Sequence, residues 1–191
     1  MKQTGIKNQI LTIPNILSFV RLGLIPFMVW LYCGKQEYVW AGVILVISGL
    51  TDVVDGFIAR KFNMVSDFGK VLDPIADKFT QGAMLLCLLL RFPFMLFPLI
   101  LLLVKEIFMT ISGYIIIKKC GKVLGANWHG KAATVGIFAM MMLHIFWSNI
   151  TCLASCISIG ICAVLILLSF VLYVIRNINA LKVQNENDDM S

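Results

Sequence analysis

The chain has 191 residues, of which 60% are hydrophobic and only 14% are charged, and its mean hydropathy is +0.91. A soluble domain has about 45–50% apolar and about 25% charged residues, so this composition excludes a water-soluble globular fold. A membrane-spanning helix needs roughly 20 apolar residues. At about 30 residues for each span with its loop, the length leaves room for six spans and for no sizeable soluble domain.

Six apolar runs follow one another along the chain and predict an all-α, polytopic membrane protein with six transmembrane helices. The runs cover residues 16–33, 38–58, 71–90, 94–117, 132–146 and 152–175. The third run opens with Asp73 and Pro74, and proline is tolerated in the first turn of a helix. We expect residues 1–183 to form one six-helix catalytic domain and residues 184–191 to be a disordered polar tail.

The positive charges indicate how the helices are oriented. If the N-terminus is cytoplasmic, only Lys35 and Arg91 fall on the opposite side of the membrane. The cytoplasmic segments then hold Lys2, Lys7, Arg60, Lys61, Lys70, Lys118, Lys119, Lys122, Lys131, Arg176 and Lys182. Cytoplasmic loops carry an excess of Lys and Arg, so we expect both termini and the loops 59–70 and 118–131 on the cytoplasmic side of the cell (inner) membrane.

Two other sequence features exclude further classes of partner and site. The net charge is +6, but the basic residues form short clusters beside apolar runs and no basic arm, so we expect no nucleic-acid partner. The six cysteines have no paired spacing and lie mostly inside apolar runs. They are predicted to be small buried apolar residues.

Four aspartates form two pairs with helical spacing. Asp52 and Asp55 end the second run, and Asp73 and Asp77 start the third. Residues three or four apart share a helix face, and an antiparallel helix pair would bring the two faces together at the cytoplasmic end. Four carboxylates at the membrane boundary repel one another and need a cation. All-oxygen ligands without Cys or His favour Mg²⁺ or Mn²⁺ over zinc or copper.

Small and basic residues between the two pairs point to phosphate chemistry. Gly56 and Ala59 would open a groove along the second helix, and Arg60 would supply a fork that binds phosphate. The complete pattern is Asp52-x-x-Asp55-Gly56-x-x-Ala59-Arg60, eight residues, Gly69, three residues, Asp73, three residues, Asp77. At every position this pattern resembles the signature of the CDP-alcohol phosphotransferase family.

The resemblance implies a six-helix membrane enzyme, usually a homodimer, that releases CMP from a CDP-alcohol when a second alcohol attacks the phosphorus. It implies that Asp52, Asp55 and Asp73 hold two divalent ions against the diphosphate. It makes Asp77 the general base and a further candidate metal ligand. The cytidine and phosphates would lie against the remaining motif residues, which are Gly56, Ala59, Arg60 and Gly69.

The first apolar run bears on the acceptor alcohol. Its start, Pro14-Asn15-x-x-Ser18-x-x-Arg21, resembles that of bacterial phosphatidylglycerophosphate synthases and of the related cardiolipin synthases. This favours CDP-diacylglycerol as donor and glycerol 3-phosphate as acceptor. An acceptor phosphate needs cations, and the candidates near membrane depth are Arg21, Lys105 and Lys131.

Two departures keep other acceptors open. Lys105-Glu106 stands where an Arg-Glu pair is commoner in the synthases, and the segment 130–134 lacks the second lysine of their usual Gly-Lys-x-Lys-Thr. A cardiolipin synthase, or another member with a different acceptor alcohol, is therefore the alternative. A divalent-cation transporter is a remote one, because intramembrane carboxylates also mark ion pathways. A transporter would place its polar groups near the bilayer midplane, whereas these acids gather at one end.

Overall fold

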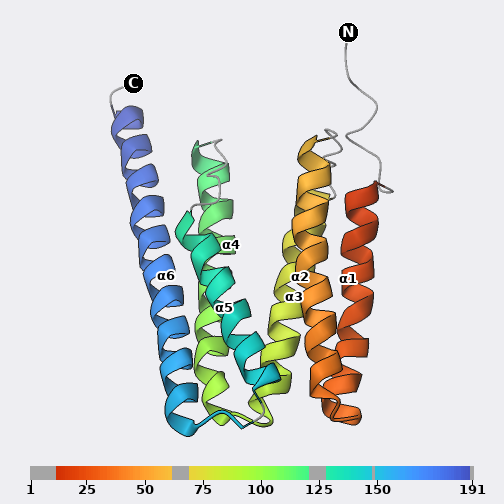
Figure 1. The fold of residues 1–191 in the computed structure, drawn as a ribbon. Helices are drawn as coiled ribbons and strands as arrows, with labels where there is room; N and C mark the ends of the chain where they lie inside the picture. Colours follow the sequence, from red (N-terminus) through yellow and green to blue (C-terminus); the bar gives the residue numbers. More distant parts are fainter. Residues whose placement is uncertain (1–11, 62–68, 121–127, 148, 190–191) are drawn as a thin grey trace. The chain divides into compact units, whose positions relative to one another are not determined.

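The computed structural model describes residues 12–61, 69–120, 128–147 and 149–189. Within these ranges the chain is helical and contains no strand, as predicted (Figure 1). It divides into two compact units, and the single catalytic domain over 1–183 stays a prediction. Unit 1 comprises Met1–Arg91 with Ile145–Ser148, and unit 2 comprises Phe92–His144 with Asn149–Ser191.

Unit 1 is built around its first helix. Its elements are α1 (Ile13–Val29), the π-helical turn η1 (Trp30–Gly34), α2 (Tyr38–Lys61) and α3 (Gly69–Leu89). Helix α1 packs extensively against both α2 and α3, which contact each other less. Because successive helices run in opposite directions, the start of α1, the end of α2 and the start of α3 lie at the same end of the unit (Figure 1).

Unit 2 contains η2 (Pro93–Met95), α4 (Leu96–Cys120), α5 (Trp128–Phe146) and α6 (Cys152–Asp189). Helix α4 packs along α6. Helix α5 meets α6 through side chains, and Gly130 lies so close to Tyr173 that a methyl group on Gly130 would come within 2.5 Å of the tyrosine hydroxyl. His144 is fully buried, with Nδ1 2.8 Å from the Met140 carbonyl and Nε2 2.9 Å from the Ser155 hydroxyl.

Five of the described helical segments have the length and hydropathy of a membrane span. These segments are Pro14–Gly34, Tyr38–Ile58, Pro93–Ile116, Trp128–Phe146 and Cys152–Asn179. Helix α3 has 21 residues, but its first half carries two acids and two lysines, and it is therefore more highly charged than the five segments above. The crossing of the membrane by α3 stays a prediction.

Helix boundaries differ from the predicted runs at three places. Helix α3 begins at Gly69, so Pro74 lies inside the helix and removes one backbone donor there. Helix α4 reaches Cys120 and α5 begins at Trp128, so much of the segment expected as a loop over 118–131 is helical. Helix α6 continues to Asp189 through the tail expected to be disordered. Extending an existing helix by one residue orders the backbone of that residue alone and adds a hydrogen bond, so a polar segment can continue a helix that has already formed.

Candidate active site

A buried arginine joins the two aspartates of α2. Arg21, on α1, lies 2.7 Å from Asp52 through Nη1 and 2.6 Å from Asp55 through Nη2. Arg21 is 1% exposed and Asp55 is 2% exposed, whereas the Asp52 side chain is 45% exposed. The guanidinium of α1 therefore neutralises a carboxylate pair at the end of α2, one member of which remains accessible.

The two aspartates of α3 have partners of their own. The Ser18 hydroxyl of α1 hydrogen-bonds with Asp73 Oδ1 and also lies 3.1 Å from the Pro14 carbonyl. Asp77 Oδ2 accepts a hydrogen bond from Gln81 Nε2 over 2.9 Å, and Lys78 Nζ lies 3.8 Å from the same oxygen. The carboxylates of α3 are thus oriented partly by α1 and partly by residues of α3 itself.

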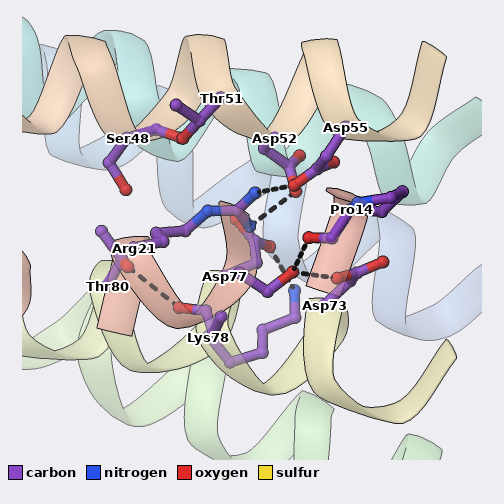
Figure 2. Close-up of polar contacts among 12 residues, drawn as sticks. Pro14, Arg21, Ser48, Thr51, Asp52, Asp55, Asp73, Asp77, Lys78 and Thr80 are labelled. Atoms are coloured by element: carbon purple, nitrogen blue, oxygen red, sulfur yellow. Dashed lines mark hydrogen bonds and ion pairs between the residues drawn. The ribbon is translucent and has the colours of Figure 1, made fainter. Parts of the chain in front are cut away.

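The four aspartates belong to one electrostatic environment. Figure 2 shows the Arg21 side chain of α1 between Asp52 and Asp55 on one side and Asp73 and Asp77 on the other. Asp55 is close enough to be repelled by Asp52 and Asp73, and Asp77 interacts electrostatically with Asp52 and Arg21. The structure therefore brings together the two aspartate pairs that the helical spacing predicted to meet.

The donor set is chemically suited to a hard divalent ion. It consists of carboxylates, which Mg²⁺ and Mn²⁺ prefer, and described residues add no cysteine or histidine to it. With the side chains as they stand, no three acidic, Cys or His residues in the described ranges are grouped closely enough to hold one ion. The carboxylates turn instead toward Arg21, Ser18 and Gln81.

The remaining motif residues continue the same surface of unit 1. Gly56 follows Asp55 on α2 and is half-buried, and Gly69 is buried at the first position of α3. The backbone of Ala59 and Arg60 belongs to α2, but the side chains of these two residues lie outside the described part of the chain. Their predicted contacts with the donor stay predictions.

The two other predicted acceptor cations lie in unit 2. Lys105 of α4 is 5% exposed, and its Nζ lies 3.5 Å from Glu106 Oε1; the sequence analysis did not predict this pair. Lys131 is exposed on the first turn of α5. The structure pairs Arg21 with aspartates of unit 1, so of the three predicted acceptor cations only Lys105 and Lys131 share a unit.

A buried histidine near the start of α5 lies beside the cations Lys105 and Arg176. His129 is 7% exposed, and its Nδ1 lies 3.4 Å from the Ser169 hydroxyl. Its ring packs edge-on against Tyr173 at 4.5 Å, and Arg176 lies over that tyrosine at 4.8 Å. Lys105 and Arg176 both act electrostatically on His129, so the three basic groups come from three different helices of unit 2.

Two residues of the site, Ser18 and Gln81, have no role predicted from the sequence. Ser18 belongs to the N-terminal pattern that starts at Pro14, and its spacing from Asn15 and Arg21 places all three on the buried face of α1. Gln81 lies four residues after Asp77, where a helical side chain reaches back to its predecessor. That spacing was a usable signal for Gln81.

Comparison with known proteins gives a consistent result. The profile of the CDP-alcohol phosphatidyltransferase family matches residues 11–175. A cardiolipin synthase (CMP-forming) of Streptomyces coelicolor is 34% identical over 144 residues, which cover 71% of this chain and 67% of that protein. A CDP-diacylglycerol–glycerol-3-phosphate 3-phosphatidyltransferase of Rickettsia bellii is 38% identical over 96 residues, which cover 49% of this chain and 53% of that protein.

A further relative matches a shorter segment of the chain. A putative cardiolipin synthase of Mycobacterium tuberculosis is 44% identical over 72 residues, or 38% of this chain and 34% of that protein. The chain therefore matches about half of the Rickettsia protein and about a third of the mycobacterial one. These similarities favour the transferase over the cation transporter and leave two kinds of acceptor among the named relatives.

Proposed function

Because the chain belongs to the CDP-alcohol phosphatidyltransferase family, we propose that it transfers the phosphatidyl group of CDP-diacylglycerol to glycerol 3-phosphate and releases CMP. The observation that carries this proposal is the meeting of the four motif aspartates of α2 and α3 around Arg21 (Figure 2). The name of the Rickettsia relative supports the choice of acceptor.

In the proposed reaction, Asp77 takes the proton of the acceptor hydroxyl. The freed oxygen forms a bond with the phosphatidyl phosphorus, and the bond from that phosphorus to the bridging oxygen breaks, so CMP leaves with the electron pair. Asp77 suits this role because the Gln81 amide fixes one of its oxygens and its side chain is only 18% exposed. A positioned carboxylate of this kind contributes typically 10²–10⁴-fold to a rate.

Two divalent ions, Mg²⁺ or Mn²⁺, would be held by Asp52, Asp55 and Asp73, with Asp77 beside them. Bound there, they would supply positive charge to the diphosphate. The carboxylate donor set supports this assignment. Gly56 and Ala59 would lie against the cytidine, and Arg60 and Gly69 near the phosphates.

Basic side chains would recognise the acceptor phosphate. Buried Lys105 and exposed Lys131 are the proposed contacts, and the positive charges of Lys105 and Arg176 support a negatively charged acceptor. Charge-assisted hydrogen bonds of this type are the strong ones. Arg21 was a third candidate, but its two terminal nitrogens are engaged with Asp52 and Asp55.

A second candidate function is a cardiolipin synthase that uses phosphatidylglycerol as acceptor. The Streptomyces relative, which carries that name and is matched over 67% of its length, favours it. Both reactions release CMP and both acceptors carry a phosphate, so the aspartates and lysines serve either one. The distinguishing property is whether the acceptor is a water-soluble phosphate or a second lipid.

We further propose that the enzyme is a homodimer in the cell (inner) membrane, that α3 crosses the membrane with the other five helices, and that the aspartates face the cytoplasm. The bias of Lys and Arg toward one side of the predicted topology supports this orientation. A cytoplasmic site also suits both nucleotide release and a soluble acceptor.

An acceptor panel tests the proposal. The full chain, purified in detergent, would receive CDP-diacylglycerol and Mg²⁺ with glycerol 3-phosphate, phosphatidylglycerol, inositol phosphate or serine, and released CMP would be measured. We expect CMP with glycerol 3-phosphate and none from the Asp77→Asn variant. CMP with phosphatidylglycerol alone would assign the second function, and no CMP with any acceptor would reject both.

A further inference from the structure

The guanidinium of Arg21 occupies the place where a cation is expected between two metal-binding carboxylates. It contacts Asp52 at 2.7 Å and Asp55 at 2.6 Å, and it comes from α1, whereas both acids belong to α2. Resting on the proposed function, we propose that Arg21 is a positioning residue that keeps Asp52 and Asp55 together before metal binds, so that the ions compete with an internal cation.

Burial makes this ion pair a strong determinant of how the acids are placed. Asp52 and Asp55 are three residues apart on one helix, where like charges repel, and Arg21 and Asp55 are almost fully buried. A buried carboxylate without a counter-charge is strongly unfavourable, and loss of one partner of a buried pair is costly. Arg21 therefore supplies the charge that allows the two acids to face each other in the absence of metal.

The charges of the whole site lead to the same conclusion. The four aspartates carry a formal charge of −4, and Arg21 with Lys78, which lies 3.8 Å from Asp77, brings the total to −2. Replacement of Arg21 by a neutral residue would leave −3 at the same position. Since opposite charges attract more strongly in a partly buried site than in water, a divalent ion would bind such a variant more tightly.

The guanidinium is suited to this role by its shape. Its planar fork contacts one carboxylate through each terminal nitrogen, which a lysine ammonium cannot reproduce in the same geometry. The Nε atom of Arg21 is buried and has no hydrogen-bond partner among the described residues. The contacts of the guanidinium are thus directed at the acid pair through its terminal nitrogens.

Binding of Mn²⁺ to the full chain, without donor or acceptor, tests this inference. Free Mn²⁺ would be measured by electron paramagnetic resonance during a titration. We expect Arg21→Gln to lower the Kd for Mn²⁺ by at least about tenfold and Arg21→Lys to lower it less. The melting temperature of Arg21→Gln should fall in EDTA and recover when Mn²⁺ is added, while the parent protein changes less.

The matched control is Arg91→Gln, which removes an arginine of the same unit that lies over the ring of Tyr38 at 5.0 Å; it should leave the Kd for Mn²⁺ unchanged. An unchanged or weaker Mn²⁺ affinity in a folded Arg21→Gln protein would overturn the inference. If that variant does not fold, Arg21→Lys decides the question by the same criterion.

The same titration separates this role from recognition of the acceptor. If Arg21 bound the acceptor phosphate instead, both substitutions would raise only the KM for glycerol 3-phosphate and leave Mn²⁺ binding as it was, which would overturn the inference. Because the titration needs no turnover, its result stands apart from the acceptor panel. Failure of every acceptor with the expected change in Mn²⁺ affinity would reject the proposed function and support the role of Arg21.

Discussion

The side-chain amide of Gln81 donates a hydrogen bond to Asp77 Oδ2 over 2.9 Å, one helical turn along α3. Gln81 is fully buried, and its Oε1 has no hydrogen-bond partner among the residues that the structure describes. The buried amide of Gln81 therefore makes its one side-chain hydrogen bond among the described residues with Asp77, the carboxylate proposed to act as the general base. This arrangement predicts that Gln81 matters more for turnover than for stability.

Gln81→Leu should lower kcat about tenfold or more, because a hydrogen bond to a charged group contributes about 1.5–3 kcal/mol. Leucine has a similar volume and removes the unsatisfied Oε1, so the melting temperature should stay close to that of the parent. Measurement of kcat beside thermal unfolding checks both parts. Thr80→Val is the control, since it removes only a hydroxyl bonded to the Ala76 carbonyl at 2.9 Å; equal losses of kcat in both variants would contradict the prediction.

Asp77→Asn should abolish CMP release while binding of CDP-diacylglycerol persists. The amide keeps the size of the side chain but cannot accept the proton of the acceptor hydroxyl. Turnover and equilibrium binding of the donor would be measured on the same preparation. Glu37→Gln, an acid-to-amide change at the opposite end of unit 1, serves as control, and residual turnover near the parent rate in Asp77→Asn would show that another group is the base.

Lys131→Ala and Lys105→Met should each raise the KM for glycerol 3-phosphate by about tenfold, with a smaller effect on the KM for the donor. The expected size follows from the loss of one charge-assisted hydrogen bond. Methionine is chosen for Lys105 because that side chain is buried. Lys35→Ala is the control, since that lysine lies over Trp30 at 5.3 Å; equal effects on both substrates would reject a role in acceptor binding.

Cys33 and Cys87 provide a test of the packing in unit 1. Their sulfur atoms lie 3.5 Å apart, and a disulfide needs about 2.05 Å, so a small side-chain movement would join η1 to α3. Mild oxidation with copper phenanthroline should yield a peptide cross-link that mass spectrometry detects. Cys33→Ser should abolish it, and a cross-link to any other cysteine in preference to Cys87 would argue against this packing.

Much of the fold followed from the sequence because the apolar runs are long. Runs of some 20 apolar residues leave few alternatives to spanning helices, and the five helical segments with the length and hydropathy of a span arise in this way. The ends of the helices were harder to predict. Nothing local in the polar residues after Val183 indicates that α6 continues to Asp189, and Pro74 indicates a helix start although α3 begins at Gly69.

The aspartate pairs were predictable for a different reason, because helical spacing alone fixes which residues share a face. The partner of Asp52 and Asp55 was not predictable, since contacts between α1 and α2 depend on how the helices pack. The sequence predicts a contact of Arg21 with the acceptor and gives no signal for its contact with the two acids. The contact between Cys33 and Cys87 was unpredictable for the same reason, because their spacing along the chain does not indicate that the two thiols meet between η1 and α3.

The pairing of Arg21 with acids of α2 also bears on how the protein is made. Asp52 and Asp55 follow Arg21 by 31 and 34 positions, so during synthesis α1 emerges before the residues that neutralise its charge. An arginine at the centre of an isolated span costs about 2.5–3.5 kcal/mol even on lenient scales, and Arg21, in the first half of the span Pro14–Gly34, would incur part of that cost. Helix α1 would therefore settle in the bilayer together with α2, as a hairpin, and chains that stop before Asp52 would retain α1 poorly.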